Sequence, residues 1–393
     1  MFLDAVLARN PKLIDAAFQL HREAAIPPNT FVIDLDSVAE NAALLHNAAL
    51  SNGLSLYFTT KQIGFNPRAA GCVLRSGIAK ALAIDFREAA VLSQHGIPIG
   101  HIGHIVQTPA QMIEAVLKLE PDVITVFSRA KAQQLSQAAV ALGREVRLLL
   151  RVISDKDFFF PGQEGGLLLD NLEEEASAIL RLPNVRIAGV TSYPCLELEA
   201  GSRTLRPSSN FYTILRAAEI LREKAGVQIE QINAPGNTCV SSMPLLAKMG
   251  ATHAEPGHAL TGTTYLHTQP GEAEVPALVY VSEISHINGT KAYAFGGGTY
   301  RRARAYWALV GPGPKQTRRA AVEAIDPTTI DYYVALSLPD HQAAAVGDTV
   351  VLASRAQIFV TRAYVAVVQG IQKGSPALLG LYDAWGREVE KIL

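Results

Sequence analysis

The sequence predicts an α/β protein: a (β/α)8 barrel of the TIM type followed by a mostly β C-terminal domain. Two observations predict this. Short runs rich in Val, Ile and Leu alternate with Ala-rich amphipathic stretches up to about residue 260, whereas beyond residue 270 strand-like runs follow one another without long helices. Strands that are buried on both faces read as continuous apolar runs, so the first pattern is typical of parallel strands joined by helices.

The predicted elements begin with a helical lead over residues 1–28, which Pro27-Pro28-Asn29 ends. A barrel over residues 29–270 follows, because eight apolar runs are the number that a closed (β/α)8 barrel needs. The competing interpretation is an open, doubly wound sheet, but eight regular units favour closure. The runs are residues 30–35, 54–60, 79–84, 100–106, 122–127, 146–153, 187–191 and 228–233.

Residues 271–393 are expected to form the β domain. Glycine-rich and proline-rich turns, Gly296-Gly297-Gly298 and Pro312-Gly313-Pro314, separate its predicted strands. Those strands are residues 277–284, 292–295, 333–336, 349–352 and 358–367.

The composition excludes several classes of protein. Hydrophobic residues make up 49% of the 393 residues and charged ones 18%, which is ordinary for a globular chain with a large core. The net charge is −1 with both signs mixed, so we expect no nucleic-acid partner. No apolar run reaches the length of a membrane span, and Asp4 and Arg9 interrupt the segment that would form a signal core. Cys72, Cys195 and Cys239 are few and far apart, which fits a reducing compartment, and we expect a cytoplasmic protein.

Sites in a barrel of this kind lie at the carboxyl ends of the strands. Lys61 follows the run 54–60, and an amino group at the inner end of an apolar strand is costly unless it is paired or covalently used. The ordinary alternative is a solvated lysine just past the strand, which for a single residue is the commoner outcome.

Two further strand ends carry candidate binding groups. The loop Gly236-Asn237-Thr238 follows the run 228–233, and its backbone N–H groups and hydroxyl can cradle a phosphate. A plain turn with a helix cap has the same composition. Shortly beyond, Glu255-Pro256-Gly257-His258 brings a carboxylate and free backbone amides into one turn, with a solvated surface turn as the alternative.

His101 and His104 lie on the run 100–106. Because alternate residues of a strand point to opposite faces, we expect at most one of them to point into the barrel, and we expect no metal pair there. In the C-terminal domain, the three glycines before Tyr300 permit close backbone approach, while Arg301 and Arg302 fit an exposed strand.

Taken together, these features resemble the fold-type III, alanine-racemase-like family of pyridoxal-phosphate enzymes, most closely its YhfX-type branch, over nearly the whole chain. The most specific part is the ordered set of Lys61, the loop Gly236-Asn237-Thr238 and the turn Glu255-Pro256-Gly257. The resemblance implies that pyridoxal 5′-phosphate is the cofactor and that Lys61 holds it as a Schiff base. It also implies that Gly236, Asn237 and Thr238 bind the phosphate, and that Gly257 and His258 give backbone amides to it.

Glu255 departs from the racemases, which have Arg before the Pro-Gly turn, next to the pyridine nitrogen. The decarboxylases of the family have Glu-Pro-Gly-Arg, and here the last residue is His258. A carboxylate beside the pyridine nitrogen stabilises its protonated form, which is the stronger electron sink for a carbanion at the α-carbon. Phe65 stands where the racemases have a Tyr that reaches the phosphate, which puts that contact in doubt.

The second base that the resemblance implies is a Tyr of the β domain, delivered across the interface of a homodimer. Tyr300 is the best match, and Tyr293 is the alternative. The metal-dependent relatives carry His and Cys where this chain has Gln357 and Phe359. Neither of these is a suitable zinc ligand, so we expect no catalytic metal.

Three functions compete. The first is an amino-acid racemase, with Lys61 and Tyr300 as bases on opposite faces of the α-carbon. The second is a decarboxylase or a metal-free lyase, which Glu255 favours. The third is a non-catalytic pyridoxal-phosphate-binding protein, since the small cofactor-homeostasis proteins share a strand like Ile102-Gly103-His104 but lack the β domain. The identity of the amino-acid-like substrate and the roles of Tyr193, Cys195, Arg301, Arg302 and Arg304 stay open at this point.

Overall fold

A computed structural model describes the chain except for residues 200, 301–302, 325, 327, 329, 339–343, 361 and 391–393. By its internal contacts the chain divides into two compact units. The barrel unit consists of Leu45–Thr60 and Gly77–Gly257, and the β unit consists of Met1–Leu44, Lys61–Ser76 and His258–Leu393.

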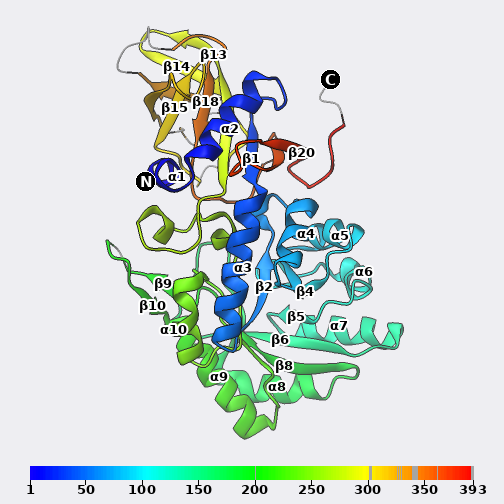
Figure 1. The fold of residues 1–393 in the computed structure, drawn as a ribbon. Coiled ribbons are helices and arrows are strands. Elements are labelled where there is room, and N and C mark those ends of the chain that lie inside the picture. Colours follow the sequence, from blue (N-terminus) through cyan, green and yellow to red (C-terminus); the bar gives the residue numbers. More distant parts are fainter. Residues whose placement is uncertain are drawn as a thin grey trace. The chain divides into compact units, whose positions relative to one another are not determined.

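The barrel unit contains a closed parallel sheet, as the sequence predicts (Figure 1). Neighbouring strands follow the order β5-β4-β3-β2-β12-β11-β8-β6, and β6 pairs with β5 to close the ring. Within the described part of the chain, the eight strands of this ring are β2 (Ser55–Thr59), β3 (Lys80–Ala83), β4 (Ile99–Ile102), β5 (Val123–Val126), β6 (Val146–Ile153), β8 (Val185–Thr191), β11 (Gln231–Asn233) and β12 (His253–Ala254). Short additional strands are β7 (Leu167–Leu168), β9 (Leu196–Leu198) and β10 (Leu205–Pro207).

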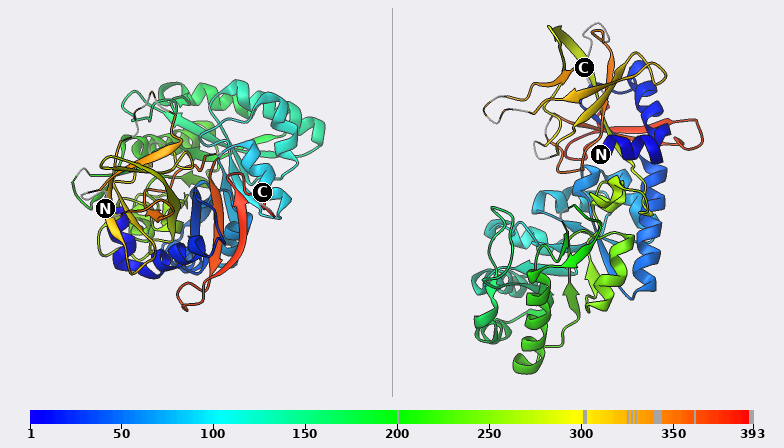
Figure 2. Two further views of the ribbon diagram at one scale, coloured as in Figure 1. Left: turned by 90° about the horizontal axis from the view of Figure 1, so that it is seen from above. Right: turned by 90° about the vertical axis from the view of Figure 1, so that its left-hand side faces the viewer.

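Helices lie on the outside of the barrel strands (Figures 1 and 2). Local sequence determines where these helices begin and end, as α7 illustrates: the hydroxyl of Ser128 accepts a hydrogen bond from the backbone N–H of Lys131 at 3.2 Å, and Gly143 ends the helix with φ 62°. The helices of this unit are α5 (Phe86–Gln94), α6 (Ile113–Leu117), α7 (Arg129–Leu142), α8 (Leu172–Leu180), α9 (Ser209–Ala225) and α10 (Met243–Lys248). Five strands of this ring contribute to one cluster of buried side chains: Tyr57, Leu82, Val123, Leu149 and Ala188.

One of the eight predicted barrel strands is wrong. The run 30–35 forms β1 (Thr30–Asp34), which pairs antiparallel with β13 (Leu278–Asn288) and parallel with β19 (Tyr364–Gln369) in the β unit. Any strand with both faces buried reads as an apolar run, so its composition does not reveal which sheet it joins. The eighth barrel strand is the two-residue β12. Lys61 therefore follows the first strand of the barrel and Gly236 follows the seventh.

The β unit is built on a mostly antiparallel sheet, which confirms the predicted β fold. Six strands close into a ring in the order β13-β14-β17-β16-β15-β18, and β1, β19 and β20 continue from β13. The strands not yet given are β14 (Lys291–Phe295), β15 (Trp307–Gly311), β16 (Arg318–Val322), β17 (Tyr333–Ser337), β18 (Thr349–Leu352) and β20 (Ala377–Asp383).

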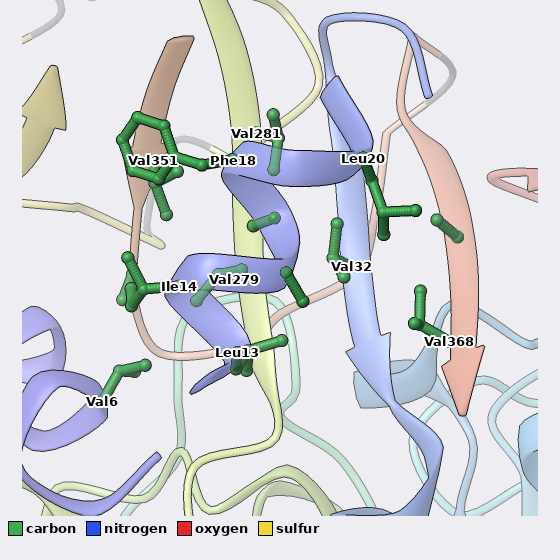
Figure 3. Close-up of a cluster of buried hydrophobic side chains, with 14 of the residues drawn as sticks. Val6, Leu13, Ile14, Phe18, Leu20, Val32, Val279, Val281, Val351 and Val368 are labelled. Carbon is green, nitrogen blue, oxygen red and sulfur yellow. The ribbon is translucent and has the colours of Figure 1, made fainter. Parts of the chain in front are cut away.

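Two N-terminal helices, α1 (Phe2–Arg9) and α2 (Pro11–Arg22), lie against this sheet, where Figure 2 shows them in blue beside the yellow and orange strands. Figure 3 shows the resulting core, in which apolar side chains of α2 face those of β13, β18, β1 and β19. Its labelled members are Val6, Leu13, Ile14, Phe18, Leu20, Val32, Val279, Val281, Val351 and Val368. The remaining helices are α3 (Leu35–Ser51) and α4 (Pro67–Arg75).

Asn10 fixes the start of α2 and ties it to two other segments of the β unit. Its side-chain oxygen accepts from the backbone N–H of Leu13 at 3.3 Å. Its amide donates to Asp34 Oδ2 at 3.0 Å and to the carbonyl of Pro276 at 2.9 Å. Asn10 is buried, so these bonds satisfy groups that water does not reach.

The predicted domain limits, residues 1–28, 29–270 and 271–393, stay a prediction, and the two compact units interleave along the chain. Among the described residues, no helix combines the length and the apolar character that crossing a membrane requires.

Candidate functional site

The carboxyl end of β2 leads directly into Lys61, which begins a short 3-10 turn, Lys61–Ile63. In the β unit this turn contacts a second one, His258–Thr261, which begins immediately after the Pro-Gly turn. Burial lowers the pKa of His258 well below its ordinary value, and the positive charges of Arg355 and Lys61 lower it further. Lys61 and His258, both singled out from the sequence, therefore lie close together, and Arg355, which no sequence motif marked, is a cationic neighbour of His258.

Glu255 directly follows β12 and is buried in the barrel unit. Its Oε1 accepts two hydrogen bonds, from His101 Nδ1 at 2.6 Å and from Asn233 Nδ2 at 2.6 Å. Burial alone would raise the pKa of Glu255, but the imidazoles of His104 and His101 and these hydrogen bonds lower it to about 2. The side chain is therefore a carboxylate at neutral pH, as the interpretation of Glu255 requires.

His101 lies on β4, is buried, and bridges two strands. Its Nδ1 faces Glu255, and its Nε2 lies 2.6 Å from the hydroxyl of Thr125 on β5. The side chains of His101, Thr125 and Glu255 are all buried, so their polar atoms must be hydrogen-bonded by protein groups rather than by bulk water.

The expectation that at most one of the two histidines points into the barrel is wrong. The rings of His101 and His104 lie 5.4 Å apart, and both residues are buried. The alternation of a strand does not apply, because β4 ends at Ile102 and Gly103 turns the chain with φ 86°. A Cβ on Gly103 would lie 2.8 Å from the carbonyl oxygen of Thr125, so glycine is needed at this turn.

His104 has no hydrogen-bond partner for either ring nitrogen within the described residues. Burial lowers its pKa to about 3, which keeps the ring neutral. The ring packs edge-on against that of Tyr193, with ring centroids 5.9 Å apart, so one contact of Tyr193 is with His104.

Cys195 lies two residues beyond Tyr193 and is buried, and burial raises the pKa of its thiol well above the ordinary value.

The predicted phosphate loop follows β11 and has the backbone of a tight turn. Gly236 and Asn237 have φ values of 120° and 48°, and Asn237 donates its amide to the carbonyl of Leu196 at 3.0 Å. Thr238 is buried, and its hydroxyl has no hydrogen-bond partner among the described residues. The role of this loop stays a prediction, and a buried hydroxyl without a partner is of the kind that a phosphate oxygen can satisfy.

Gly257 is buried in the turn after Pro256, whose carbonyl accepts from the backbone N–H of Thr59 at 2.8 Å. Gly236, Asn237, Thr238, Glu255 and Gly257 all belong to the barrel unit, whereas Lys61 and His258 belong to the β unit by contacts. Two of the places where the chain passes from one unit to the other are Thr60–Lys61 and Gly257–His258, which follow the neighbouring strands β2 and β12.

Tyr300, the predicted second base, is a partly exposed residue of the β unit, 37% accessible. Arg301 and Arg302 lie outside the described residues. Arg304 packs over the ring of Tyr306 at 4.8 Å, which is a surface arrangement. Phe65 is buried beside the ring of Trp385, and Phe359 stacks on Phe31 with ring centroids 3.8 Å apart, so both are packing residues of the β unit.

Two residues of the barrel interior escaped the sequence analysis because they lie within apolar runs. Asn233 ends β11 and binds Glu255. Arg151 is fully buried on β6, with its guanidinium 4.6 Å from the ring of Phe127 and a hydrogen bond to the carbonyl of His104 at 3.3 Å. Burial lowers the pKa of Arg151 to about 10, so it remains a cation. A charged residue inside an apolar strand was the available signal for Arg151.

Two buried groups among the described residues bring three metal-ligating atoms within 4.8 Å of one another: His101, His104 and Glu255, and His267, Glu272 and Glu274. In the first, both nitrogens of His101 are already hydrogen-bonded. In the second, Arg9 donates to the carbonyl of Glu272 at 2.6 Å and supplies a positive charge. The expected absence of a catalytic metal stays a prediction.

Family models match most of the chain. Residues 33–265 match the model described as "Alanine racemase, N-terminal domain", and residues 279–378 match "YhfX-like, C-terminal domain". The chain is 41% identical over 390 residues to the uncharacterized protein YhfX of Escherichia coli (strain K12), across 99% of this chain and 100% of that protein.

Solved structures with the same fold carry different reactions in their names. One is an alanine racemase of Clostridium difficile 630 in complex with cycloserine, at a TM-score of 0.65 and 17% identity, covering 91% of this chain and 98% of that one. Another is a D-threonine aldolase from Filomicrobium marinum, at a TM-score of 0.64 and 15% identity, covering 92% of this chain and 96% of that one. At such identities the likeness shows the fold and not the reaction.

Proposed function

The chain belongs to the alanine-racemase-like family of fold-type III pyridoxal-phosphate enzymes, and on that premise we propose that it is an amino-acid racemase that holds pyridoxal 5′-phosphate on Lys61. The observation that carries the proposal is the position of Lys61, directly after the first barrel strand, where sites of this fold gather. Burial lowers the pKa of its neighbour His258 and keeps the ring neutral, so this ring places no positive charge beside the amino group.

The loop after β11 supports a phosphate site. Gly236 has no side chain where a Cβ would lie 3.2 Å from the backbone nitrogen of Cys195, and the hydroxyl of Thr238 is buried without a partner. A buried hydroxyl without a partner costs about 1–3 kcal/mol, which a phosphate oxygen would recover. Gly236, Asn237, Thr238, Gly257 and His258 would hold the phosphate.

Glu255 supports catalysis rather than binding alone. Both of its described hydrogen bonds fall on Oε1, which leaves Oε2 to accept a hydrogen bond from a protonated ring nitrogen. The bound cofactor would withdraw electrons from the α-carbon of an amino acid, and more strongly with that nitrogen protonated. A carboxylate whose pKa is about 2 is well suited to this task.

Racemisation needs a proton acceptor on each face of the α-carbon. Lys61 would serve one face, and Tyr300 of a second subunit would serve the other, which makes the enzyme a homodimer in this proposal. Its substrate would be a small amino acid or a close analogue, and its few, buried cysteines fit a cytoplasmic enzyme. A non-catalytic role as a cofactor binder is disfavoured, because it leaves the β unit without a task.

The first test is covalent capture. The protein is incubated with pyridoxal 5′-phosphate, reduced with borohydride and digested, and the modified peptide is identified by mass. We expect a phosphopyridoxyl group on Lys61, its loss in Lys61→Ala, and its retention in the control Lys118→Ala, which changes an exposed lysine. Labelling of other lysines alone, or no uptake of cofactor, would refute the proposal.

The second test identifies the reaction. Single amino acids of both configurations are incubated with the enzyme in deuterium oxide, and exchange and configuration at the α-carbon are followed by NMR. Exchange with inversion supports the racemase. Exchange with full retention, for every amino acid that exchanges, would exclude it.

A decarboxylase or metal-free lyase is the second candidate, and the observation that favours it is Glu255 itself. A protonated ring nitrogen supports a longer-lived carbanion than racemisation needs. Release of carbon dioxide from an amino acid, measured by manometry or by a coupled assay, would select this candidate over the first.

A further inference from the structure

We propose that His101 is a positioning residue for Glu255, and that the hydroxyl of Thr125 in turn fixes the ring of His101. The inference rests on the proposed function, because it concerns the carboxylate that would partner the cofactor. It adds two residues, from strands β4 and β5, that neither the sequence nor the family comparison assigns to the site.

The geometry forms a continuous row of short contacts. The hydroxyl of Thr125, the ring of His101 and the carboxylate of Glu255 are joined by distances of 2.6 Å and 2.6 Å. Asn233 adds a third contact of 2.6 Å to the same carboxylate oxygen. Thr125, His101 and Asn233 lie on three strands of one closed sheet, and Glu255 directly follows a fourth, so the backbone of the barrel holds each end of the row.

The positions of the hydrogen atoms follow from the chemistry of the groups. An ionised carboxylate only accepts, so Nδ1 of His101 must carry the hydrogen in its bond to Glu255. Nε2 and the hydroxyl of Thr125 lie 2.6 Å apart, and a hydroxyl can either donate to a ring nitrogen or accept from it. Thr125 therefore fixes the orientation of the ring whose Nδ1–H points at the carboxylate.

The surroundings keep other groups from replacing His101 in this role. Burial holds the rings of His104 and His253 neutral by lowering each pKa, to about 3 and about 4. Burial also raises the pKa of Tyr57 to about 12 and that of the Cys195 thiol, so both stay protonated. Arg151 is a permanent cation, but its described hydrogen bonds go to backbone carbonyls rather than to Glu255.

Loss of the Thr125 hydroxyl would have a specific consequence. Without that hydroxyl, Nε2 of His101 loses its described hydrogen-bond partner, and the ring loses a contact that fixes its orientation. The Nδ1–H can then turn away from Oε1 of Glu255, and the carboxylate would rotate or lose one of its two described donors. Each of these changes weakens the carboxylate of Glu255 as a partner of the cofactor's ring nitrogen, and none of them alters a contact with the substrate.

The test compares Thr125→Val, Thr125→Ser and His101→Gln with the control Thr108→Val. Thr108 is a buried threonine of the same unit whose hydroxyl has no partner among the described residues, so its loss removes no hydrogen bond. Three quantities are measured for each holoenzyme: kcat and KM on the best substrate, the visible absorption of the bound cofactor between pH 5 and 9, and the ring ¹⁵N signals of His101. The ring signals are recorded on the cofactor-free protein as well and are assigned by their absence in His101→Gln.

We expect Thr125→Val and His101→Gln to lower kcat by roughly ten- to a hundredfold, while KM changes by less than about threefold. Losses of this size are typical when a residue that hydrogen-bonds to a metal ligand, without touching the metal, is replaced. The pH dependence of the visible absorption should shift in both variants. Thr125→Ser should restore the parent values, and Thr108→Val should match the parent. The double variant should be no slower than His101→Gln alone, because Thr125 acts through His101.

Wild-type kcat, absorption and ¹⁵N signals in Thr125→Val would overturn the proposal, and so would additive losses in the double variant. If Thr125→Val does not fold, Thr125→Ala and His101→Asn carry the same test. Failure of the proposed function is distinguishable: the parent would then bind no cofactor, while the ¹⁵N signals of the cofactor-free protein would still report whether the hydroxyl of Thr125 bonds to the ring of His101.

Discussion

Acidification should destabilise the protein through His104, and a single substitution should remove that part of the effect. The ring is buried, and its pKa is lowered from 6.5 to about 3, so the unfolded chain takes up a proton below pH 6.5 that the folded chain refuses until about pH 3. Stability therefore rises with pH across this window. At pH 5, which is about 1.5 units below the pKa of the unfolded histidine, protonation stabilises the unfolded chain by about 1.36 kcal/mol per unit. The free energy of unfolding is therefore lower by about 2 kcal/mol.

The perturbation is His104→Leu, which keeps a side chain of similar size and cannot titrate. Urea unfolding curves at pH 8 and pH 5, with no cofactor added, give the free energy of unfolding of parent and variant. We expect the parent to lose about 2 kcal/mol more than the variant between the two pH values. At pH 8 the variant should be at least as stable as the parent, because both ring nitrogens of His104 are buried without partners.

The matched control is His95→Leu, which removes an exposed histidine of the same unit. Its pH dependence should follow the parent. If His104→Leu loses stability with acid as steeply as the parent does, His104 is not a buried neutral base, and the reasoning fails.

Three further predictions concern stability and catalysis. Gly189→Ala should leave the barrel unit insoluble or without a cooperative transition by circular dichroism, because the new Cβ would lie 1.8 Å from the carbonyl oxygen of Gln231, whereas Gly226→Ala, at φ 64° in open space, should cost only about 1–2 kcal/mol. Asn10→Ala should lower the free energy of unfolding by about 2–3 kcal/mol in urea, since it removes a helix cap and buried hydrogen bonds at once. Tyr300→Phe should slow α-proton exchange for one enantiomer far more than for the other, and equal losses for both would count against Tyr300 as the second base.

The sequence predicted the barrel because its strands are continuous apolar runs, and this pattern survives in seven of its eight strands. The prediction of barrel strands was wrong at two places, for opposite reasons. The run that begins at Thr30 has the composition of a barrel strand but pairs in the other sheet. His253–Ala254 is a barrel strand of only two residues, one of them polar, and its pattern is too short to detect.

The β unit was predicted less completely. The segments around β13, β14, β17 and β18 were recognised, whereas β15, β16 and β20 were not. Arg318–Val322 begins with two arginines and is only partly buried, so it lacks the apolar character that marks a strand. The run predicted over 358–367 begins six residues early, because Phe359 is buried as a stacking partner of Phe31 and not as part of β19.

In the candidate site, the sequence predicts roles for residues that stand next to strand ends and turns, such as Lys61 and Glu255, and these roles stay predictions. It gives no sign of the contacts that Thr125, Asn233 and Arg151 make across the barrel, because no local pattern records what faces a side chain in the fold. The two histidines were misjudged because one residue, Gly103, ends the alternation on which the prediction depended.

The pairing of β1 with β13 and β19 also constrains the order in which this protein can fold during synthesis. Strand β1 is synthesised before the barrel, yet both of its partners are synthesised after it. The apolar faces of α1 and α2 likewise stay exposed until β13, β18 and β19 have been made. The barrel can close while the chain is still growing, whereas the β unit can be completed only after the whole barrel has been synthesised. A nascent chain arrested after Gly257 would therefore expose the apolar faces of α1 and α2, and transiently exposed apolar surface of this kind promotes aggregation and is bound by chaperones.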